Sequence, residues 1–166
     1  MASTTDRIEK TVLLRAPVER VWRAVSDARE FGAWFGVAFE GPFVAGAPLH
    51  GRIVPTQVDP EVAELQKPHE GASFEIVVDR IERPRLFSFR WHPFAIDPGH
   101  DYSAEPMTLV VFALEPAAPA AERTRLTITE SGFDAIPLSR RAAAFTANED
   151  GWAHQARLVE KYVSRG

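Results

Sequence analysis

The sequence contains no cysteine, and this absence excludes several kinds of site at once. The chain cannot form a disulfide, a cysteine-ligated zinc or iron–sulfur centre, or a thiolate nucleophile. It also lacks any run of eighteen apolar residues, so we expect no membrane-spanning helix. The first ten residues, MASTTDRIEK, include no apolar segment of the signal-peptide kind, and we therefore expect a cytoplasmic protein.

An excess of positive charge is missing as well. The formal net charge is −4 and the isoelectric point is near 5.7, whereas binding to phosphate backbones needs clustered Lys and Arg. We therefore expect no nucleic-acid partner. Neither a Gly-rich dinucleotide motif nor a G-x-S-x-G turn occurs, so the sequence predicts no cofactor and no serine-hydrolase site. With 166 residues, 45% of them hydrophobic, the chain is predicted to fold as a single domain over residues 1–166.

Short segments with alternating apolar residues, separated by Gly- and Pro-rich turns, predict an antiparallel sheet of about six or seven strands. The predicted strands are residues 8–14, 37–40, 49–54, 73–82, 86–91, 107–114 and 125–130. Pro17 precedes apolar residues at helical spacing, and Asp27 with Glu30 resembles a capping box, so two short helices should follow the first strand. Residues 55–71 read as a surface excursion with one helical turn, and whether they form a lid stays open.

The last segment has the most regular apolar pattern of the chain. Spacings of four and three place eight residues on one stripe of a long helix: Leu138, Ala142, Phe145, Glu149, Trp152, Ala156, Val159 and Val163. Gly151 lies inside this helix at a cost of about 1 kcal/mol relative to Ala, and could mark a bend or a frayed point. The order of elements predicts an α+β fold in which a curved antiparallel sheet wraps around the C-terminal helix.

Several stretches carry a family resemblance: VLLRAPVERVWRAVSDAREFGAWFG near the start, FSFRWHP in the middle, TRLTITESGF later and GWAHQARLVEKYV at the end. Together they resemble the heat-shock-protein-90 ATPase activator homologue-like family of the START-like, or SRPBCC, helix-grip superfamily. This resemblance implies a sheet that grips the C-terminal helix, with a cavity between them that takes apolar small molecules in many relatives. It also implies a chaperone as one conceivable partner.

Residues that would face this cavity are the candidate ligand-binding residues. In RLFSFRWH the rings alternate onto one face of the strand, and in TRLTITES residue 130 shares a face with two apolar residues. Two carboxylates, one on the sheet and one on the helix stripe, would then approach the interior, unless solvent wets both. The predicted ligand-binding residues are Trp34, Phe35, Phe87, Phe89, Trp91, Glu130, Phe145, Glu149 and Trp152.

A metal site is the weakest of the candidate chemistries. One loop carries His92, Asp97, His100 and Asp101, but their spacing matches no helical His pattern, and we predict no metal. The leading hypothesis is binding of a small, largely apolar ligand, aromatic or lipid-like. Two alternatives remain: a cyclase, dehydratase or hydrolase acting on polyketide-like substrates, or an interaction module such as a co-chaperone or homodimer. The sequence leaves open whether any reaction is catalysed.

Overall fold

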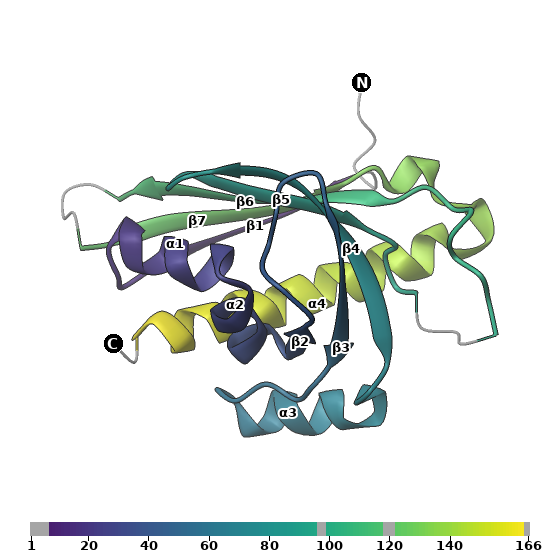
Figure 1. Cartoon of the computed structure of the whole chain (residues 1–166), viewed down its shortest axis with the longest axis horizontal. Helices are drawn as coiled ribbons and strands as arrows, with labels where there is room; N and C mark the ends of the chain where they lie inside the picture. Colours follow the sequence, from purple (N-terminus) through teal and green to yellow (C-terminus); the bar gives the residue numbers. More distant parts are fainter. Residues whose placement is uncertain (1–6, 96–98, 118–121, 165–166) are drawn as a thin grey trace.

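The computed structural model describes residues 7–95, 99–117 and 122–164 of the chain. Its strands form one antiparallel sheet in the order β1-β7-β6-β5-β4-β3-β2, so that β1 pairs with the last strand and the others follow as a meander (Figure 1). The strands are β1 Arg7–Leu14, β2 Val37–Phe39, β3 Pro48–Ile53, β4 Ser73–Glu82, β5 Leu86–Trp91, β6 Thr108–Pro116 and β7 Thr124–Ser131. All seven predicted strands are confirmed, within one or two residues at their ends.

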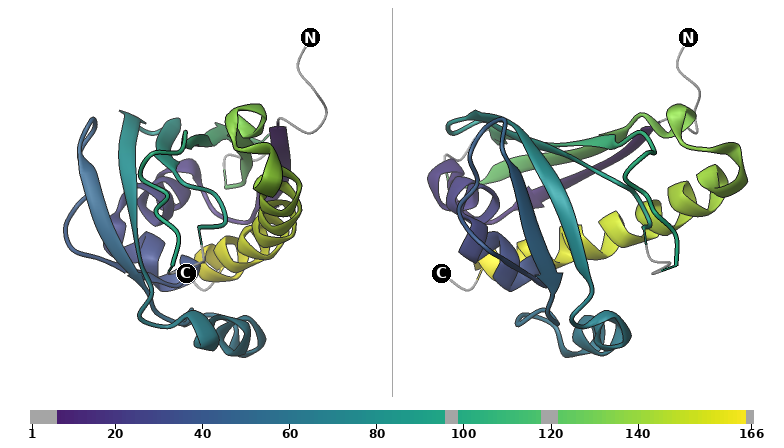
Figure 2. Two further views of the ribbon diagram at one scale, coloured as in Figure 1. Left: turned by 90° about the vertical axis from the view of Figure 1, so that its right-hand side faces the viewer. Right: turned by 45° about the vertical axis from the view of Figure 1, so that its right-hand side comes forward.

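The helices are α1 Val18–Ser26, α2 Ala28–Phe35, α3 Pro60–Gln66 and α4 Leu138–Ser164, with short 3₁₀ turns η1 Lys67–His69 and η2 Phe133–Ala135. Helices α1, α2 and α4 lie against one side of this sheet, whereas α3 lies beyond its edge in the connection between β3 and β4 (Figure 1). Helix α4 packs along β1 and crosses α2. Figure 2 shows the sheet bending around the interior, with α4 along the side that the strands leave open. The predicted α+β fold, with a curved sheet and a gripping C-terminal helix, is therefore confirmed.

The bend of the sheet coincides with an irregularity in β4. The register between β4 and β5 shifts between Val78 and Arg80, and such bulges increase the local twist of a strand. The strands beyond this point, β3 and β2, turn towards α2 and close the interior on the side opposite β1 (Figure 2).

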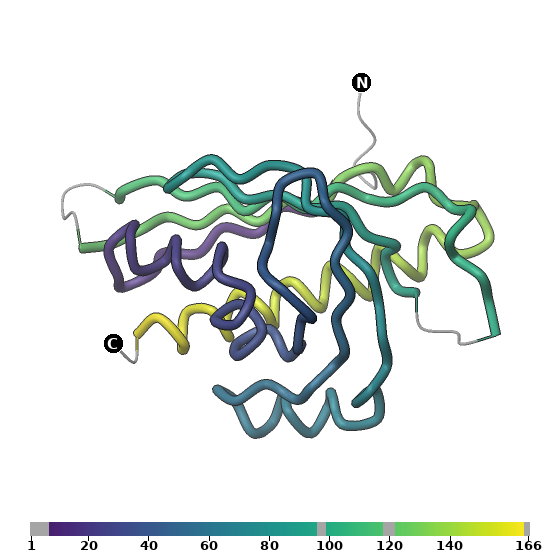
Figure 3. Tube along the Cα trace, in the orientation of Figure 1, coloured from purple at the N-terminus to yellow at the C-terminus, as the bar shows by residue number. Residues whose placement is uncertain are grey.

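Helix α2 is built to return the chain abruptly into β2. Asp27 caps it by accepting hydrogen bonds from the backbone N–H groups of Arg29 and Glu30, at 2.9 and 3.0 Å. Gly32 must be glycine, because a β-carbon there would collide with the carbonyl oxygen of Val37. Gly36 ends the helix with φ +98°, the left-handed conformation that favours glycine. The resulting turn from α2 into β2 can be followed in Figure 3.

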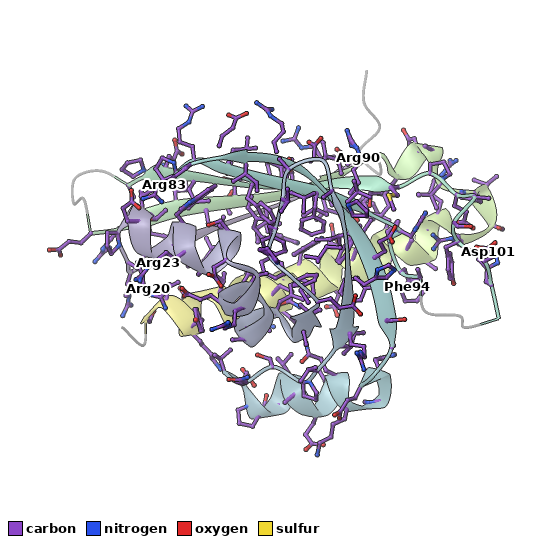
Figure 4. All side chains as sticks on the ribbon, in the orientation of Figure 1. Arg20, Arg23, Arg83, Arg90, Phe94 and Asp101 are labelled. Atoms are coloured by element: carbon purple, nitrogen blue, oxygen red, sulfur yellow. The ribbon has the colours of Figure 1, made fainter. Side chains whose placement is uncertain are left out.

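Aromatic side chains fill the space between the sheet and α4. Phe31 of α2, only 1% exposed, is at the centre of this cluster, and Trp22 of α1 is buried in the same core. Seven rings have centroids within 6.4 Å of the Phe31 ring: Trp34, Phe35, Phe39, Phe43, Phe87, Phe89 and Phe112. Figure 4 shows how densely side chains occupy this interior. The sheet and helix therefore enclose a packed aromatic core.

Helix α4 runs without a break through Gly151. The predicted stripe is right in its second half, where Trp152, Val159 and Val163 are buried, and wrong at its start. Leu138 is 79% exposed, and Ala142 is exposed as well. A strict alternation of fours and threes averages 3.5 residues per turn, whereas a straight helix has 3.6, so the predicted stripe drifts off the buried face over several turns.

A buried carboxylate and an adjoining aromatic pocket

Glu130 near the end of β7 is a completely buried acidic residue. The alternation of β7 places it on the same face as Leu126 and Ile128, and all three side chains are 0% exposed. This confirms the inward direction expected from the sequence. Burying a carboxylate away from water is costly unless hydrogen bonds replace its hydration, so its surroundings decide whether the fold tolerates it.

Four side chains from three elements supply those hydrogen bonds. The indole N–H groups of Trp91 and Trp152 donate to Oε2 and Oε1 of Glu130, each at 2.8 Å. The Thr108 hydroxyl donates to Oε2 at 2.5 Å, and the Asn148 amide spans both oxygens at 2.8 and 3.1 Å. Indole and amide N–H groups can only donate, so this set complements a carboxylate. Among the described residues, no cation forms an ion pair with Glu130.

A small pocket adjoins this hydrogen-bonded group. Its volume is about 90 Å³, and it opens to solvent between α2 and α4. The lining residues are Phe35, Trp91, Asn148, Gly151, Trp152 and Gln155. The rings of Phe35, Trp91 and Trp152 form a triangle with centroid separations of 5.8–6.2 Å. Gly151 keeps one wall open, because nothing lies within 4 Å of where its β-carbon would be.

Gln155 brings an unused acceptor to this pocket. Its Nε2 donates to the backbone oxygen of Phe35 at 3.2 Å, so its Oε1, on the other side of the amide, points away from that oxygen. Within the described part of the chain, this buried Oε1 has no hydrogen-bond partner. A buried acceptor without a donor costs about 1–3 kcal/mol, so a ligand that donates a hydrogen bond here would recover that free energy.

The same Phe35 oxygen also fastens the 55–71 excursion. Gln66 at the end of α3 donates to it at 3.0 Å and accepts a hydrogen bond from the Thr56 backbone N–H at 2.7 Å. An ion pair between Asp59 and Lys161 attaches the excursion to α4 as well. Hydrogen bonding to Lys161, followed by backbone N–H donation, lowers the pKa of Asp59. Residues 55–71 are thus tied to both helices that border the pocket.

The predicted site residues separate into two groups. Phe35, Trp91 and Trp152 line the pocket, and Glu130 lies directly behind the two indoles. The remaining aromatic residues belong to the packed core or its margin. Trp34, Phe87 and Phe89 are at most 2% exposed. Phe145 packs on Phe133, with 5.2 Å between the ring centroids. The Trp34 N–H is already used on the Ala24 carbonyl oxygen at 2.8 Å.

The convergence of two carboxylates is not found, because Glu149 is exposed on the outer side of α4. A helix turns about 100° per residue, which places position 148 about 40° and position 149 about 60° from Trp152. Asn148 is therefore the residue that reaches Glu130 from this turn. The spacing of the stripe placed Glu149 on the buried face, which is wrong; the alternative, that solvent wets the carboxylates, holds for Glu149 and not for Glu130.

Three residues of the site were not expected from the sequence: Asn148, Gln155 and Gly151. Asn148 lies four residues before Trp152 and Gln155 three residues after it. This spacing places both on the helix face of Trp152 and could have indicated them from the sequence. The pocket is also small. Typical ligand pockets hold on the order of 300 Å³ or more, whereas about 90 Å³ remains beside the aromatic core.

A larger hollow of about 980 Å³ lies outside the core, between α2, β2 and the segment after β3. It is a wide surface cleft, and at one edge Glu30 accepts hydrogen bonds from Arg20 and Tyr162, at 2.8 and 3.0 Å. Burial, and then the hydrogen bond to Glu30, raise the pKa of Tyr162. No buried, unpartnered polar atom found in the described residues lies in this cleft, so the smaller pocket has the stronger chemical features.

The loop after β5 holds a separate polar group around Glu105. Its carboxylate binds the His100 ring and the Arg140 side chain, both at 2.7 Å. Burial acts to raise the pKa of Glu105, but hydrogen bonds from His100 and Arg140 outweigh it and leave the pKa below its usual value. Figure 4 labels Asp101 of this loop at the opposite end of the molecule from Arg20 on α1.

The metal combination considered from the sequence involves this loop. In the structurally described ranges, no group of three His, Asp or Glu side chains is arranged to hold a metal ion, and Asp97 lies outside those ranges. His92 and His100 both bond to Glu105, and Asp101 accepts from Ser103 at 2.7 Å. The Ser103 hydroxyl and backbone N–H lower the pKa of Asp101.

An antiparallel sheet that grips a C-terminal helix, with two short helices after the first strand, defines the helix-grip class of SRPBCC-type proteins. The chain matches one family of this class over residues 15–164. It belongs to the family of activator of Hsp90 ATPase homolog 1-like proteins. Comparison with curated proteins finds no match. No helix in the part of the chain that the structure covers has the length and apolar character to cross a bilayer.

Solved structures share this fold along almost the whole chain. DynU16, a protein of the dynemicin biosynthetic locus, is 26% identical with a TM-score of 0.65; the match covers 96% of this chain but 47% of DynU16, so the chain spans about half of that protein. Protein MLL2253 from Mesorhizobium loti is 19% identical, with a TM-score of 0.67 and coverage of 96% and 97%. A protein from Arthrobacter aurescens is 20% identical, with a TM-score of 0.70 and coverage of 98% and 88%.

Proposed function

We propose that the protein binds a small, largely apolar ligand, one end of which enters the pocket between β5, α2 and α4. The observation that carries this proposal is an aromatic pocket with an unpartnered acceptor, Gln155 Oε1, beside a buried carboxylate. Ligand pockets are mainly apolar with a few placed polar groups, and this one has three rings and two amides. The family fold supports the same conclusion, because SRPBCC-type proteins commonly bind hydrophobic ligands.

The volume limits what enters. About 90 Å³ is room for roughly three water-sized groups, so the pocket takes the end of a ligand and the rest lies between the helices. A larger apolar body needs α4 and α2 to separate. Such a movement breaks the hydrogen bond that Phe35 O of α2 accepts from Gln155 of α4.

A blocking variant tests the proposal. Gly151→Leu places a side chain at the pocket mouth without a steric clash, since its β-carbon meets nothing within 4 Å. Ala143→Leu is the matched control, because it adds a leucine at an exposed position of the same helix. In a thermal-shift screen of a metabolite library, compounds that stabilise the wild type should stabilise Ala143→Leu equally and Gly151→Leu not at all. Equal stabilisation of both variants would place the ligand elsewhere.

Catalysis on polyketide-like substrates is less well supported. Similarity to DynU16 favours it, but an acid–base pair needs two carboxylates that converge, and Glu149 is on the outside of α4. Glu130 alone remains, with both oxygens already hydrogen-bonded. The test is product formation from polyketide-like substrates by the wild type and by Glu149→Gln. Product formed by the wild type and lost in the variant would support the enzyme hypothesis.

Chaperone activation is the second candidate, and the family match is the observation that favours it. An Hsp90 ATPase assay with and without the protein tests it directly. A ligand-binding role predicts an unchanged ATPase rate, whereas a stimulation that survives Gly151→Leu would support an interaction through the surface.

A further inference from the structure

We infer that the group entering this pocket is a small protonated amine, such as a methylated ammonium head. The inference rests on the proposed function and adds to it the charge and hydrogen-bonding character of the ligand. Three independent features lead to it: the arrangement of the rings, the uncompensated carboxylate behind them and the unpartnered acceptor in front.

The rings of Phe35, Trp91 and Trp152 border the pocket together and are tilted against one another. Their centroid separations are 6.2, 6.0 and 5.8 Å. A cation that enters the pocket and lies over the face of one of these rings would be within about 6 Å of its centroid, which is the range of cation–π attraction. Neutral apolar groups also pack on these rings, so the rings alone do not decide between them.

The charge of the surroundings favours the cation. Glu130 contributes a buried carboxylate directly behind Trp91 and Trp152, and no Lys or Arg lines the pocket. Within the described ranges, Glu130 is neutralised by N–H and O–H dipoles and by no ion pair. A cation in the pocket would supply the missing positive charge while leaving these hydrogen bonds in place.

The polar atoms facing the pocket are acceptors. Gln155 Nε2 donates to Phe35 O, and Gln155 Oε1, which is an acceptor, has no hydrogen-bond partner among the described residues. Asn148 uses its N–H on both oxygens of Glu130, so it too has only an oxygen left for a ligand. A ligand that donates a hydrogen bond would therefore satisfy Gln155 Oε1. Donor character and positive charge together describe a protonated amine rather than an alcohol or a carboxylate.

The volume sets the size of this head group. About 90 Å³ in a pocket that is open to solvent suits a head group of a few heavy atoms, such as three methyl groups around one nitrogen. Trimethylammonium has this shape and keeps one N–H for Gln155 Oε1. Any longer substituent on the nitrogen would leave through the opening beside Gly151.

Three probes of similar shape separate charge from hydrogen bonding: trimethylammonium, tetramethylammonium and tert-butanol. Each is titrated at constant chloride and followed by the indole N–H resonances, of which the chain has four. The Trp91 and Trp152 signals should shift, whereas those of Trp22 and Trp34, outside the pocket, serve as internal controls. We expect both ammonium ions to bind at least about tenfold more tightly than tert-butanol.

Variants at Gln155 test the acceptor. Gln155→Leu should weaken trimethylammonium about tenfold and leave tetramethylammonium, which has no N–H, unchanged. Gln155→Glu adds a negative charge beside the pocket but cannot donate to Phe35 O, and it should tighten both ions about fivefold. Circular dichroism establishes that each variant is folded.

The outcomes distinguish the two proposals. If tert-butanol binds as well as the ammonium ions, the pocket selects apolar shape: the amine inference is wrong, and ligand binding stands. If Gln155→Leu weakens both ions equally, the acceptor role is wrong. If none of the probes moves the Trp91 or Trp152 resonances, the amine inference fails, and failure of the metabolite screen as well would remove the proposed function.

Discussion

Replacing Glu130 with Gln should be among the most destabilising conservative changes in this protein. The amide keeps the shape of the carboxylate but turns one acceptor oxygen into an NH₂ group. One carboxylate oxygen faces the Trp91 indole and the other the Trp152 indole, so either orientation of the amide places N–H against N–H. Thr108 can rotate its hydroxyl to accept, but an indole cannot.

The magnitude follows from these contacts. One hydrogen bond to a charged group is lost, at about 1.5–3 kcal/mol, and one buried indole N–H is left unsatisfied, at about 1–3 kcal/mol. The free energy of unfolding should therefore fall by about 3–5 kcal/mol in Glu130→Gln. In a chain of this length, each kcal/mol lowers Tm by about 2–4 °C, so the expected decrease is roughly 6–20 °C.

The assay is guanidinium unfolding followed by tryptophan fluorescence, together with calorimetry for Tm. Glu149→Gln is the matched control: it makes the same chemical change at an exposed position of α4 and should stay within about 0.5 kcal/mol of the wild type. A loss below about 1 kcal/mol in Glu130→Gln would refute the reasoning, because the buried group would then not depend on a carboxylate. The amine inference would lose its source of negative charge at the same time.

Three further outcomes are expected. Gly151→Ala should raise the free energy of unfolding by up to about 1 kcal/mol in denaturant titrations, because the helix gains propensity and the methyl group meets no neighbour, and a decrease would mean that this position is crowded. Gly32→Ala should cost about 3 kcal/mol in the same assay, because the new methyl group collides with the backbone of β2, and a neutral result would show that α2 can move away. Glu105→Gln should destabilise the protein at pH 7 but not in strong acid, because folding lowers the pKa of Glu105. The stabilisation by Glu105 is therefore complete above the unfolded pKa of about 4.3 and is lost as pH falls through the folded pKa. Unfolding curves of wild type and variant that stay equally far apart at pH 7 and pH 2 would contradict that sign.

The fold could be predicted from local patterns because each element carries its own signal. Alternation marks the strands, and Asp27 and Gly36 mark the ends of α2. Glu130 could be placed in the interior because a strand has a period of two, which leaves no ambiguity about the face.

The pocket could not be predicted to the same degree. A helix has no whole-number period, so the choice between Asn148 and Glu149 depended on how α4 is rotated against β7, and that rotation is set by packing. The volume depended on how far the rings around Phe31 fill the interior, which is a property of their mutual angles. The unpartnered oxygen of Gln155 could not be predicted either, because it depends on the hydrogen bond that Gln155 Nε2 donates to Phe35 O in the folded protein.

The pairing of β1 with β7 has a consequence for biosynthesis. Leu14 lies opposite Thr124, and the Thr124 hydroxyl donates to the Ala16 carbonyl oxygen at 2.7 Å. The first strand can therefore pair only after β7, near the end of the chain, has been synthesised. During translation, β1 leaves the ribosome long before β7, so the backbone N–H and C=O groups that pair with β7 have no partner strand at first. The nascent protein therefore cannot complete its sheet and core until β7 and α4 have emerged from the ribosome.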